Sequence, residues 1–345
     1  MRPFVPLLLV SLTLASCSGD DPVAPQPPPP SGLGTPLTAI GALEAQTPLL
    51  WSAATNEIVA VASFNNPNPN ALIAVGAGAT TLRTLDARAA TPLALAPDGG
   101  AAYYMTFDID STVARRVTLT GAAAAARLAY CDGSCEHAVV PSPDGNLVAV
   151  RSQNTDSIHV VTVSTGARDT ITSGWPLIYR SDGARLFKKE LGEDWDEAVV
   201  YDLGTRATTP GPFANFPRDS VLAFSLRWDA ATGIQMLYVS ADKRRLILRT
   251  GSSAPEVVYV APDTIEAHLD WAPTGHAAAF WTSRASGSGR RYELRAVLHP
   301  AAGAIPVVVA YTTEPIGGVA VSANSVGAAY VVDRRLYRSV IPTGP

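Results

Sequence analysis

Five histidines give this chain its clearest capacity for chemistry. Imidazole nitrogens bind metal ions and transfer protons near neutral pH. The histidines lie far apart in the sequence, at His137, His159, His268, His276 and His299. None forms a His-Glu-x-x-His pair, so a metal site would require the fold to bring several of them together. We therefore predict no metal, no cofactor and no catalytic residue.

The densest charge lies in one acidic loop, where five carboxylates surround a tryptophan: Glu190, Glu193, Asp194, Trp195, Asp196 and Glu197. Clustered carboxylates attract a cation or basic side chains, and a tryptophan can anchor an interface. The spacing does not match a calcium-binding loop. A solvated, solubilising loop is the other interpretation, and it is the one that the spacing favours.

Two of the three cysteines, Cys131 and Cys135, are separated by three residues. In an oxidising compartment they would form a disulfide, which for so small a loop contributes only about 2 kcal/mol. A zinc or redox pair is the alternative. It is less favoured because the spacing is not Cys-x-x-Cys and no second ligand pair exists.

The N-terminus carries the strongest localisation signal. Residues 4–15 form an apolar run that is too short to span a bilayer and follows the positive charge of Arg2, which is typical of a signal peptide. Its end, Leu14-Ala15-Ser16-Cys17, resembles the bacterial lipobox. This resemblance implies that the Cys17 thiol is acylated and the chain is cleaved before it, although an ordinary secretory signal stays the alternative.

The residues after Cys17 support a lipid anchor. Residues 18–34 are polar and rich in proline, as in an extended tether. The whole chain has a formal net charge of −4 and only 16% charged residues. This composition argues against nucleic acid and against a polybasic membrane contact. We expect a monomer in the cell envelope, at the periplasmic face of the outer membrane or at the cell surface.

The rest of the chain consists of internal repeats. The clearest unit has a Ser142-Pro143-Asp144-Gly145 turn, followed by an apolar strand over residues 147–150 and another strand from Ser157. Seven turn positions recur at intervals of 38 to 51 residues: Asn56, Asp98, Asp144, Asp182, Thr232, Thr274 and Ser325. An interval of about 45 residues is typical of one four-stranded propeller blade.

These repeats resemble the TolB-like, WD40-like (PD40) propeller family, whose signature is an aromatic-Ser-Pro-Asp-Gly turn before a short apolar strand. The resemblance implies an all-β fold, a seven-bladed β-propeller of four-stranded antiparallel blades. Only the third repeat has the turn intact. The Gly-x-Ser-x-Gly motif of the related peptidases is absent, so no activity follows from the resemblance.

The predicted organisation has three parts: a signal peptide over residues 1–16, a lipidated tether over 17–34 and a propeller over 35–345. The seventh repeat lacks an outer strand, because only four residues follow its third strand at residues 335–341. An unpaired edge invites aggregation. We therefore predict that residues 37–42 pair with residues 335–341 and close the ring.

Loops between second and third strands share one propeller face with loops between blades. On that face we expect the acidic loop, the cysteine loop, Trp175, Phe213, Phe216 and the arginines Arg284, Arg290 and Arg291. The alternative interpretation of the aromatic residues is that they plug gaps between blades. We expect a non-catalytic scaffold that binds a protein or envelope component there. The alternatives are a hydrolase or lyase acting on a glycan or lactone in the central channel, with His137 and His268 at its mouth, and a structural envelope component without a dedicated ligand.

Overall fold

Strands and turns account for all the regular structure of the described residues. The computed structural model describes residues 32–37, 43, 48–62, 70–76, 82–107, 112–121, 125–131, 138–152, 155–189, 198–211, 221–229, 233–272, 275–287 and 289–342. They form twenty-eight strands, β1 to β28. In this part of the chain no helix is long and apolar enough to cross a membrane.

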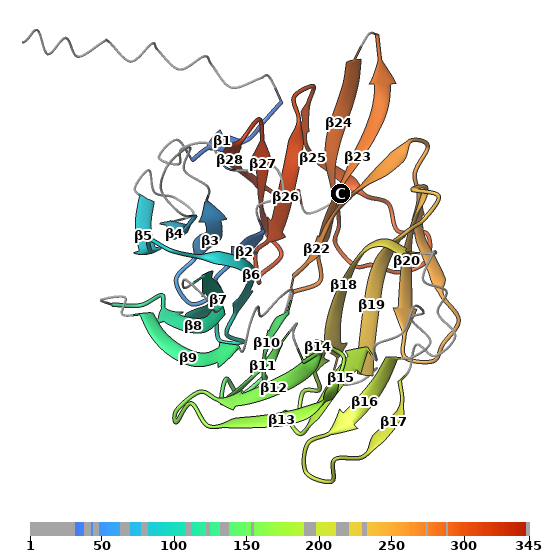
Figure 1. Ribbon diagram of the computed structural model, residues 1–345. Coiled ribbons are helices and arrows are strands. Elements are labelled where there is room, and N and C mark those ends of the chain that lie inside the picture. The colour runs from blue at the N-terminus through green and yellow to red at the C-terminus, as the bar shows by residue number, and fades with distance from the viewer. Residues whose placement is uncertain are drawn as a thin grey trace, which may run out of the picture. The chain divides into compact units, whose positions relative to one another are not determined.

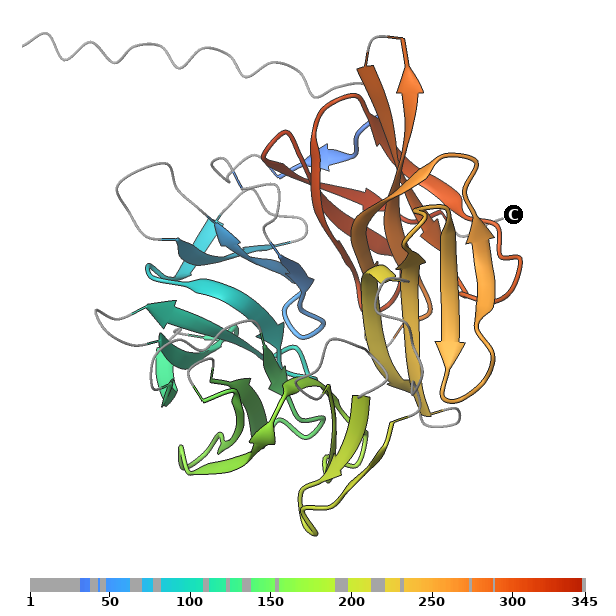
Figure 2. The same ribbon diagram turned by 45° about the vertical axis from the view of Figure 1, so that its right-hand side comes forward.

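The strands form seven four-stranded antiparallel sheets arranged as blades around a centre, as Figures 1 and 2 show. The first strand of each blade lies innermost, where it contacts the first strands of neighbouring blades. These innermost strands are β2 (Leu49–Trp51), β6 (Ala90–Leu95), β10 (Val139–Pro141), β14 (Trp175–Tyr179), β18 (Val221–Asp229), β22 (Thr264–Trp271) and β26 (Ile316–Val321). The predicted seven-bladed propeller is confirmed.

The other strands follow outward in chain order. The second strands are β3 (Glu57–Ala62), β7 (Ala101–Phe107), β11 (Leu147–Arg151), β15 (Arg185–Lys189), β19 (Gly233–Ser240), β23 (Ala278–Ser286) and β27 (Gly327–Val332). The third strands are β4 (Ala71–Gly76), β8 (Thr112–Thr118), β12 (Ser157–Thr162), β16 (Ala198–Asp202), β20 (Arg245–Thr250), β24 (Gly289–Val297) and β28 (Arg335–Val340). The fourth strands are β5 (Leu82–Asp86), β9 (Ala125–Cys131), β13 (Arg168–Ser173), β17 (Thr208–Pro210), β21 (Glu256–Val260), β25 (Val307–Thr312) and, for the seventh blade, β1 (Thr35–Pro36).

The turn in the third blade shows why the repeat folds this way. Gly145 has a φ of 70°, which a residue with a side chain rarely adopts. The Ser142 hydroxyl donates to the Asp144 carboxylate at 2.6 Å and accepts the Leu147 N–H at 2.9 Å. The turn therefore fixes the register of β10 against β11, which places Pro141 opposite Val148.

Second strands other than β15, which contains Arg185, Lys188 and Lys189, are mainly apolar because neighbouring blades cover both of their faces. All six residues of β27 are buried, and so are the last five of β3. The alternation of polar and apolar residues that marks a one-sided sheet is lost in such strands. The apolar clusters accordingly mix residues from adjacent blades, as where Tyr103 of the second blade packs with Val148 of the third.

The N-terminal segment closes the ring, as predicted, although its paired strand begins earlier in the chain. Thr35 and Pro36 lie opposite Arg338 and Tyr337 of β28. Beyond them the Leu37 N–H donates to the Leu336 carbonyl at 2.9 Å. Residues 38–42, which were expected to pair, lie outside the described residues. Proline suits this outermost strand because its nitrogen needs no partner strand.

The closing segment packs tightly against the last blade. The Gly34 N–H donates to the Tyr330 hydroxyl at 2.9 Å, and that hydroxyl also bonds Ser339 at 2.8 Å. A Cβ added at Gly34 would clash with the Arg338 carbonyl oxygen and the Ser339 hydroxyl. Only a glycine therefore lets β1 approach β28 so closely.

We expect Gly34→Ala to lower the free energy of unfolding of the whole ring by about 1–3 kcal/mol, because the backbone must move away from β28. Thermal unfolding followed by circular dichroism measures this. Gly289→Ala is the control, since its Cβ would meet only the Ser286 carbonyl oxygen, at 4.0 Å. Equal melting temperatures for the two variants would contradict the closure.

Candidate functional site

The two ends of the antiparallel strands give the propeller two different faces. We call the end with the loops between second and third strands, and between one blade and the next, the loop face. The opposite end, with the turns between first and second strands and between third and fourth strands, is the turn face. Trp175 begins β14 and the tip of the β23–β24 hairpin joins a second to a third strand, so both lie at the loop face.

Trp175 fills a gap between two blades. The guanidinium carbon of Arg151, from the third blade, lies 3.7 Å from the centroid of the Trp175 ring. Arg151 is also held by Asp156 at 2.5 Å, and its side chain is only 7% exposed. For this aromatic residue the structure therefore favours packing between blades over an open binding surface.

Most of the other predicted loop-face residues lie outside the described residues. These are Glu190, Glu193, Asp194, Trp195, Asp196, Glu197, Phe213 and Phe216. Cys17 and Cys135 also lie outside them, and Cys131 is described only as the last residue of β9. The acidic loop, the disulfide and the lipidation site stay predictions.

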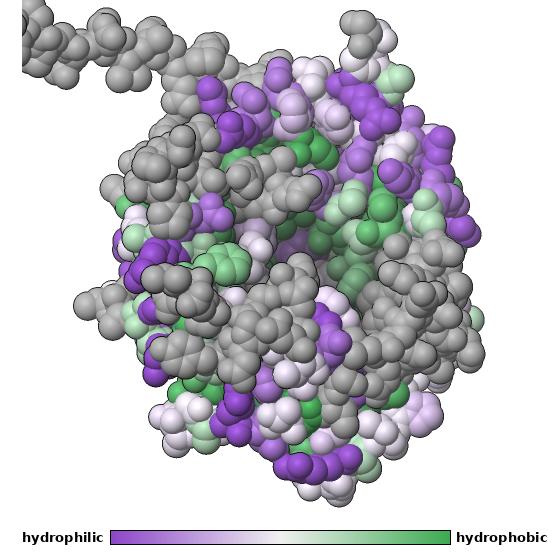
Figure 3. All heavy atoms as spheres, viewed as in Figure 1, coloured by the Kyte–Doolittle hydropathy of each residue, from purple (hydrophilic) through white to green (hydrophobic). Residues whose placement is uncertain are grey.

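The three predicted arginines lie together on the β23–β24 hairpin, whose strands are nine residues long. The side chains of Arg284, Arg290 and Arg291 are 49%, 55% and 36% exposed. Figure 3 shows strongly hydrophilic side chains at the top right of the view, where Figure 1 places this hairpin. The hairpin therefore presents guanidinium groups to solvent on a rigid support.

Glu293 organises this arginine cluster from within the hairpin. Its carboxylate, on a side chain only 12% exposed, lies 3.7 Å from Arg284, 3.3 Å from Arg291 and 2.5 Å from Arg295. A carboxylate that contacts several guanidinium groups limits the rotamers of each of them. The arginine side chains are held in place before any partner arrives.

Glu266 of the innermost strand β22 holds the remaining arginine of the hairpin. Its carboxylate accepts hydrogen bonds from Arg290 at 3.2 Å and from the Ser283 hydroxyl at 2.5 Å. The cluster thus contains four arginines, including Arg295, and two glutamates. It keeps an excess of positive charge that suits an anionic partner.

The histidines do not form a common site in the part of the chain that is described. His159 is buried and bonds the Thr170 hydroxyl at 3.0 Å, and His276 stacks on His299 with the ring centroids 4.9 Å apart. Burial lowers the pKa of His268, against the opposing charge of Glu266. Among the described residues no three His, Cys, Asp or Glu side chains could share a metal ion. His137 lies outside the described residues, so its convergence with His268 stays untested.

One carboxylate at the centre of the ring is strongly perturbed, and the sequence analysis missed it. Asp270 on β22 accepts the N–H of Val321, from β26 of the next blade, at 2.7 Å. Burial raises the pKa of Asp270 to about 6, although hydrogen bonds from the N–H groups of Val321 and Trp271 oppose the shift. Desolvation dominates because burial destabilises the carboxylate by more than hydrogen bonds from two amide groups stabilise it.

This shift predicts a pH dependence of stability. The folded-state pKa of Asp270 is near 6, above its unfolded value near 3.9. The contribution of Asp270 to the free energy of unfolding is therefore complete below about pH 4 and is lost as the pH rises through about 6. Asp270→Asn stays neutral, so its stability relative to wild type should improve by about 2 kcal/mol between pH 4 and pH 7.

Urea unfolding across this pH range measures the effect. Asp242→Asn is the control and should differ from wild type by a nearly constant amount, because the Ser240 hydroxyl lowers the pKa of Asp242 and the resulting stabilisation is lost only as the pH falls below the unfolded value near 3.9. A difference between Asp270→Asn and wild type that does not change with pH would contradict the shifted pKa.

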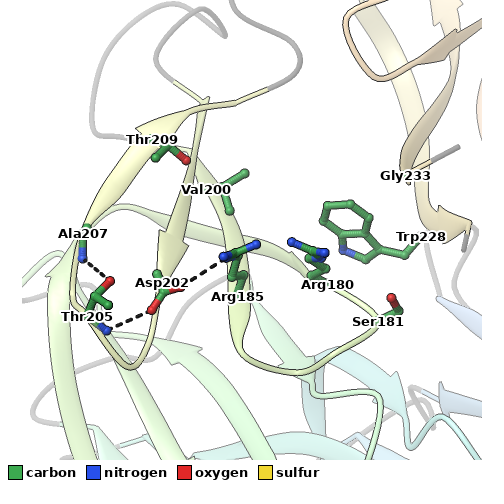
Figure 4. A pocket seen from close by; sticks show the side chains of 10 residues that line it. All are labelled: Arg180, Ser181, Arg185, Val200, Asp202, Thr205, Ala207, Thr209, Trp228 and Gly233. Carbon is green, nitrogen blue, oxygen red and sulfur yellow. Dashed lines mark hydrogen bonds and ion pairs between the residues drawn. The ribbon is translucent and has the colours of Figure 1, made fainter.

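A groove of about 650 Å³ lies between the fourth and fifth blades, and it opens at the turn face. Figure 4 shows two guanidinium groups side by side at its centre, with an indole ring on one wall and a strand of the fourth blade on the other. Its lining residues are Arg180, Ser181, Arg185, Val200, Asp202, Thr205, Ala207, Thr209, Trp228 and Gly233. The sequence analysis placed binding on the loop face and did not find this groove.

The Asp202 carboxylate accepts several hydrogen bonds within the groove wall. It accepts the N–H groups of Gly204 at 3.1 Å and Thr205 at 2.9 Å, and Arg185 Nε at 3.1 Å. These bonds, first among them the one from Thr205, lower the pKa of Asp202 to about 2. The group therefore stays ionised and orients Arg185, which argues against a role as a general base.

Known structures share this fold at low sequence identity. A chain of the Mitotic Checkpoint Complex aligns with a TM-score of 0.56 at 14% identity, over 98% of this chain and 100% of that one. An oligogalacturonate lyase in complex with manganese aligns with a TM-score of 0.61 at 12% identity, over 86% of this chain and 89% of that one. TolB from Acinetobacter baumannii aligns with a TM-score of 0.47 at 14% identity, over 86% of this chain and 63% of that one. No protein-family model matches the chain, and neither does any curated protein sequence. The chain is a β-propeller, and these likenesses extend no further than the fold.

Proposed function

We propose that this protein is a lipid-anchored, non-catalytic scaffold of the bacterial cell envelope, which binds an anionic segment of a protein or another envelope component. The arginine cluster of the β23–β24 hairpin is the observation that carries the proposal. It combines exposed guanidinium groups with a rigid support, and it lies on the loop face, where binding was predicted. Guanidinium groups held by carboxylates are suited to bidentate recognition of another acid.

The place where the tether joins the propeller also supports binding at the hairpin. Gly32, close to the start of the described residues, accepts the Tyr311 N–H of β25 at 3.1 Å and packs against the Tyr311 ring. The Arg291 guanidinium lies over the same ring, 4.5 Å from its centroid. An anchor at Cys17 would therefore keep the hairpin close to the point from which the chain leads to the membrane.

The anchor is tested by Cys17→Ser, which removes the thiol that would be acylated. We expect the precursor to stay uncleaved by the lipoprotein peptidase and to incorporate no labelled fatty acid. Metabolic labelling and gel mobility measure both outcomes. Ser16→Ala, which keeps a small residue before the cysteine, should be processed normally. Fatty-acid labelling of the Cys17→Ser variant would overturn the anchor.

The hairpin is tested by the triple variant Arg284→Gln, Arg290→Gln and Arg291→Gln. Arg295 stays paired with Glu293 in this variant, so the fold should be retained. We expect crosslinks to the partner in the native host to disappear, and the affinity of the captured partner to fall roughly tenfold or more at low salt. Crosslinking with mass spectrometry identifies the partner, and titration measures the affinity.

Arg206→Gln is the matched control, because it removes an exposed arginine that pairs with Asp169 at 2.9 Å on the turn face. Crosslinks that survive the triple variant unchanged would exclude the hairpin from the binding site. Crosslinks lost equally in both variants would show a general effect of charge and would also count against the hairpin.

The alternative of a hydrolase or lyase at the central channel requires a titratable group on an innermost strand, and Asp270 is the candidate. The pKa of Asp270, raised to about 6 by burial, lies where a general acid or base works near neutral pH. If the protein turned over a glycan or lactone, Asp270→Asn should abolish that turnover and leave partner binding at the hairpin unchanged.

A further inference from the structure

The groove between the fourth and fifth blades arises where the fourth blade departs from its own repeat. In each of six blades, the residue that follows the innermost strand donates its N–H to the carbonyl of the residue just before or at the start of the second strand. In five of them this residue is small and buried: Ser52, Ala96, Ser142, Ala272 and Ser322. In the fourth blade it is Arg180, whose side chain is 41% exposed.

The residue on the other side of the same turn differs from blade to blade, and in the order of the six blades it is Glu57, Ala101, Leu147, Arg185, Ala277 and Gly327. In the seventh blade it is Gly327, and the ring of Trp51 from the first blade packs so closely there that an added Cβ would lie 2.8 Å from it. In the fourth blade the same position holds Arg185. The glycine leaves room for the tryptophan of the next blade, whereas Arg185 places a guanidinium in the groove that Trp228 lines.

Trp228 of the fifth blade is the tryptophan that lines the groove together with Arg180 and Arg185. It lies one residue before the end of its innermost strand, whereas Trp51 and Trp271 are the last residues of theirs. Those two are buried, with 6% and 4% exposure, whereas Trp228 is half-buried and lines the groove. Figure 4 shows its ring beside the Arg180 guanidinium. The boundary that carries Arg180, in place of the small residue of five other blades, and Arg185 is thus open, whereas the boundary between the seventh and first blades is packed.

The two guanidinium groups are each held at one atom only. Arg180 Nε lies 3.2 Å from Asp182, and Arg185 Nε lies 3.1 Å from Asp202. No other polar contact of their terminal nitrogens is found among the described residues, and Figure 4 shows these nitrogens in the space between Val200 and Trp228. Each aspartate therefore orients a guanidinium and leaves its terminal N–H donors available to an acceptor.

We propose that this groove binds a small organic carboxylate, with the carboxylate between Arg180 and Arg185 and a flat apolar side of the molecule on the Trp228 ring. The hydroxyls of Ser181, Thr205 and Thr209 provide further polar contacts along the wall. Two kinds of molecule share this chemistry, a sugar acid and an aromatic acid. The site lies on the turn face, and binding there depends neither on the anchor at Cys17 nor on the arginine hairpin.

The proposal is tested by isothermal titration of the purified full chain in mild detergent with D-glucuronate, indole-3-acetate, D-glucose and inorganic phosphate. We expect saturable binding of at least one of the two acids at concentrations up to about 10 mM. Binding of glucuronate alone identifies a sugar acid as the ligand class, and binding of indole-3-acetate alone identifies an aromatic acid. Binding of glucose as tight as that of glucuronate, of phosphate as tight as that of either acid, or of no probe at all would overturn the proposal.

Arg180→Ser restores the residue that three other blades have at this turn, so the variant should fold and bind the acid at least about tenfold more weakly. Arg185→Leu, which copies Leu147 of the third blade, is the second variant and should have the same effect. Arg206→Gln, which lies in the same blade but outside the groove lining, should bind as the wild type does. Equal affinities for Arg180→Ser or Arg185→Leu and Arg206→Gln would overturn the proposal.

Discussion

The whole propeller depends on the pairing of β1 with β28. No blade can bury both of its faces alone, so each relies on two neighbours, and the first and seventh blades become neighbours only when the ring closes. The closing strand itself contributes little pairing, since only Thr35 and Pro36 lie in register with β28. The contact is strengthened by side chains behind it, where the Tyr330 hydroxyl links Gly34 to Ser339 and its ring stacks on Tyr337. Closure therefore combines a short backbone ladder, held by a buried tyrosine, with an apolar cluster in which Trp51 and Ile58 of the first blade pack with Ala329 of the seventh.

The boundaries between blades differ from one another, and the differences decide where the surface is open. At three boundaries a guanidinium lies against a tryptophan, with Arg151 on Trp175, Arg227 on Trp271 and Arg338 near Trp51. Stacking covers the apolar ring while the guanidinium keeps its polar partners, so a planar cation can fill a gap that an aliphatic residue would leave partly empty. At the boundary between the fourth and fifth blades the Arg180 guanidinium also lies beside a tryptophan, Trp228, but that tryptophan is only half-buried and both side chains line a groove.

The sequence predicted what depends on local chemistry. The Ser142–Gly145 turn, the apolar second strands and the missing outer strand of the seventh repeat are properties of short segments, and they were enough for the fold and the closure. The predicted closing strand began two residues after the observed one. Its true position is set by the contact of Gly34 with Arg338 and Ser339, about 300 residues away in the chain. The groove could not be found for a similar reason. Arg180 and Arg185 flank an ordinary turn in the sequence, and they matter only because Trp228 of the next blade lines the same groove.

A buried carboxylate at the centre of the ring has a structural explanation in the geometry of a blade. The innermost strand has no strand beyond it, so half of its backbone N–H groups face the centre and need another acceptor. Asp270 supplies one to Val321 and thereby joins the innermost strands of the sixth and seventh blades, close to the boundary that closes the ring. The cost is the desolvation that raises the pKa of Asp270 to about 6. A neutral amide side chain would satisfy the same N–H with less desolvation, so the carboxylate is not the most stable solution at this position.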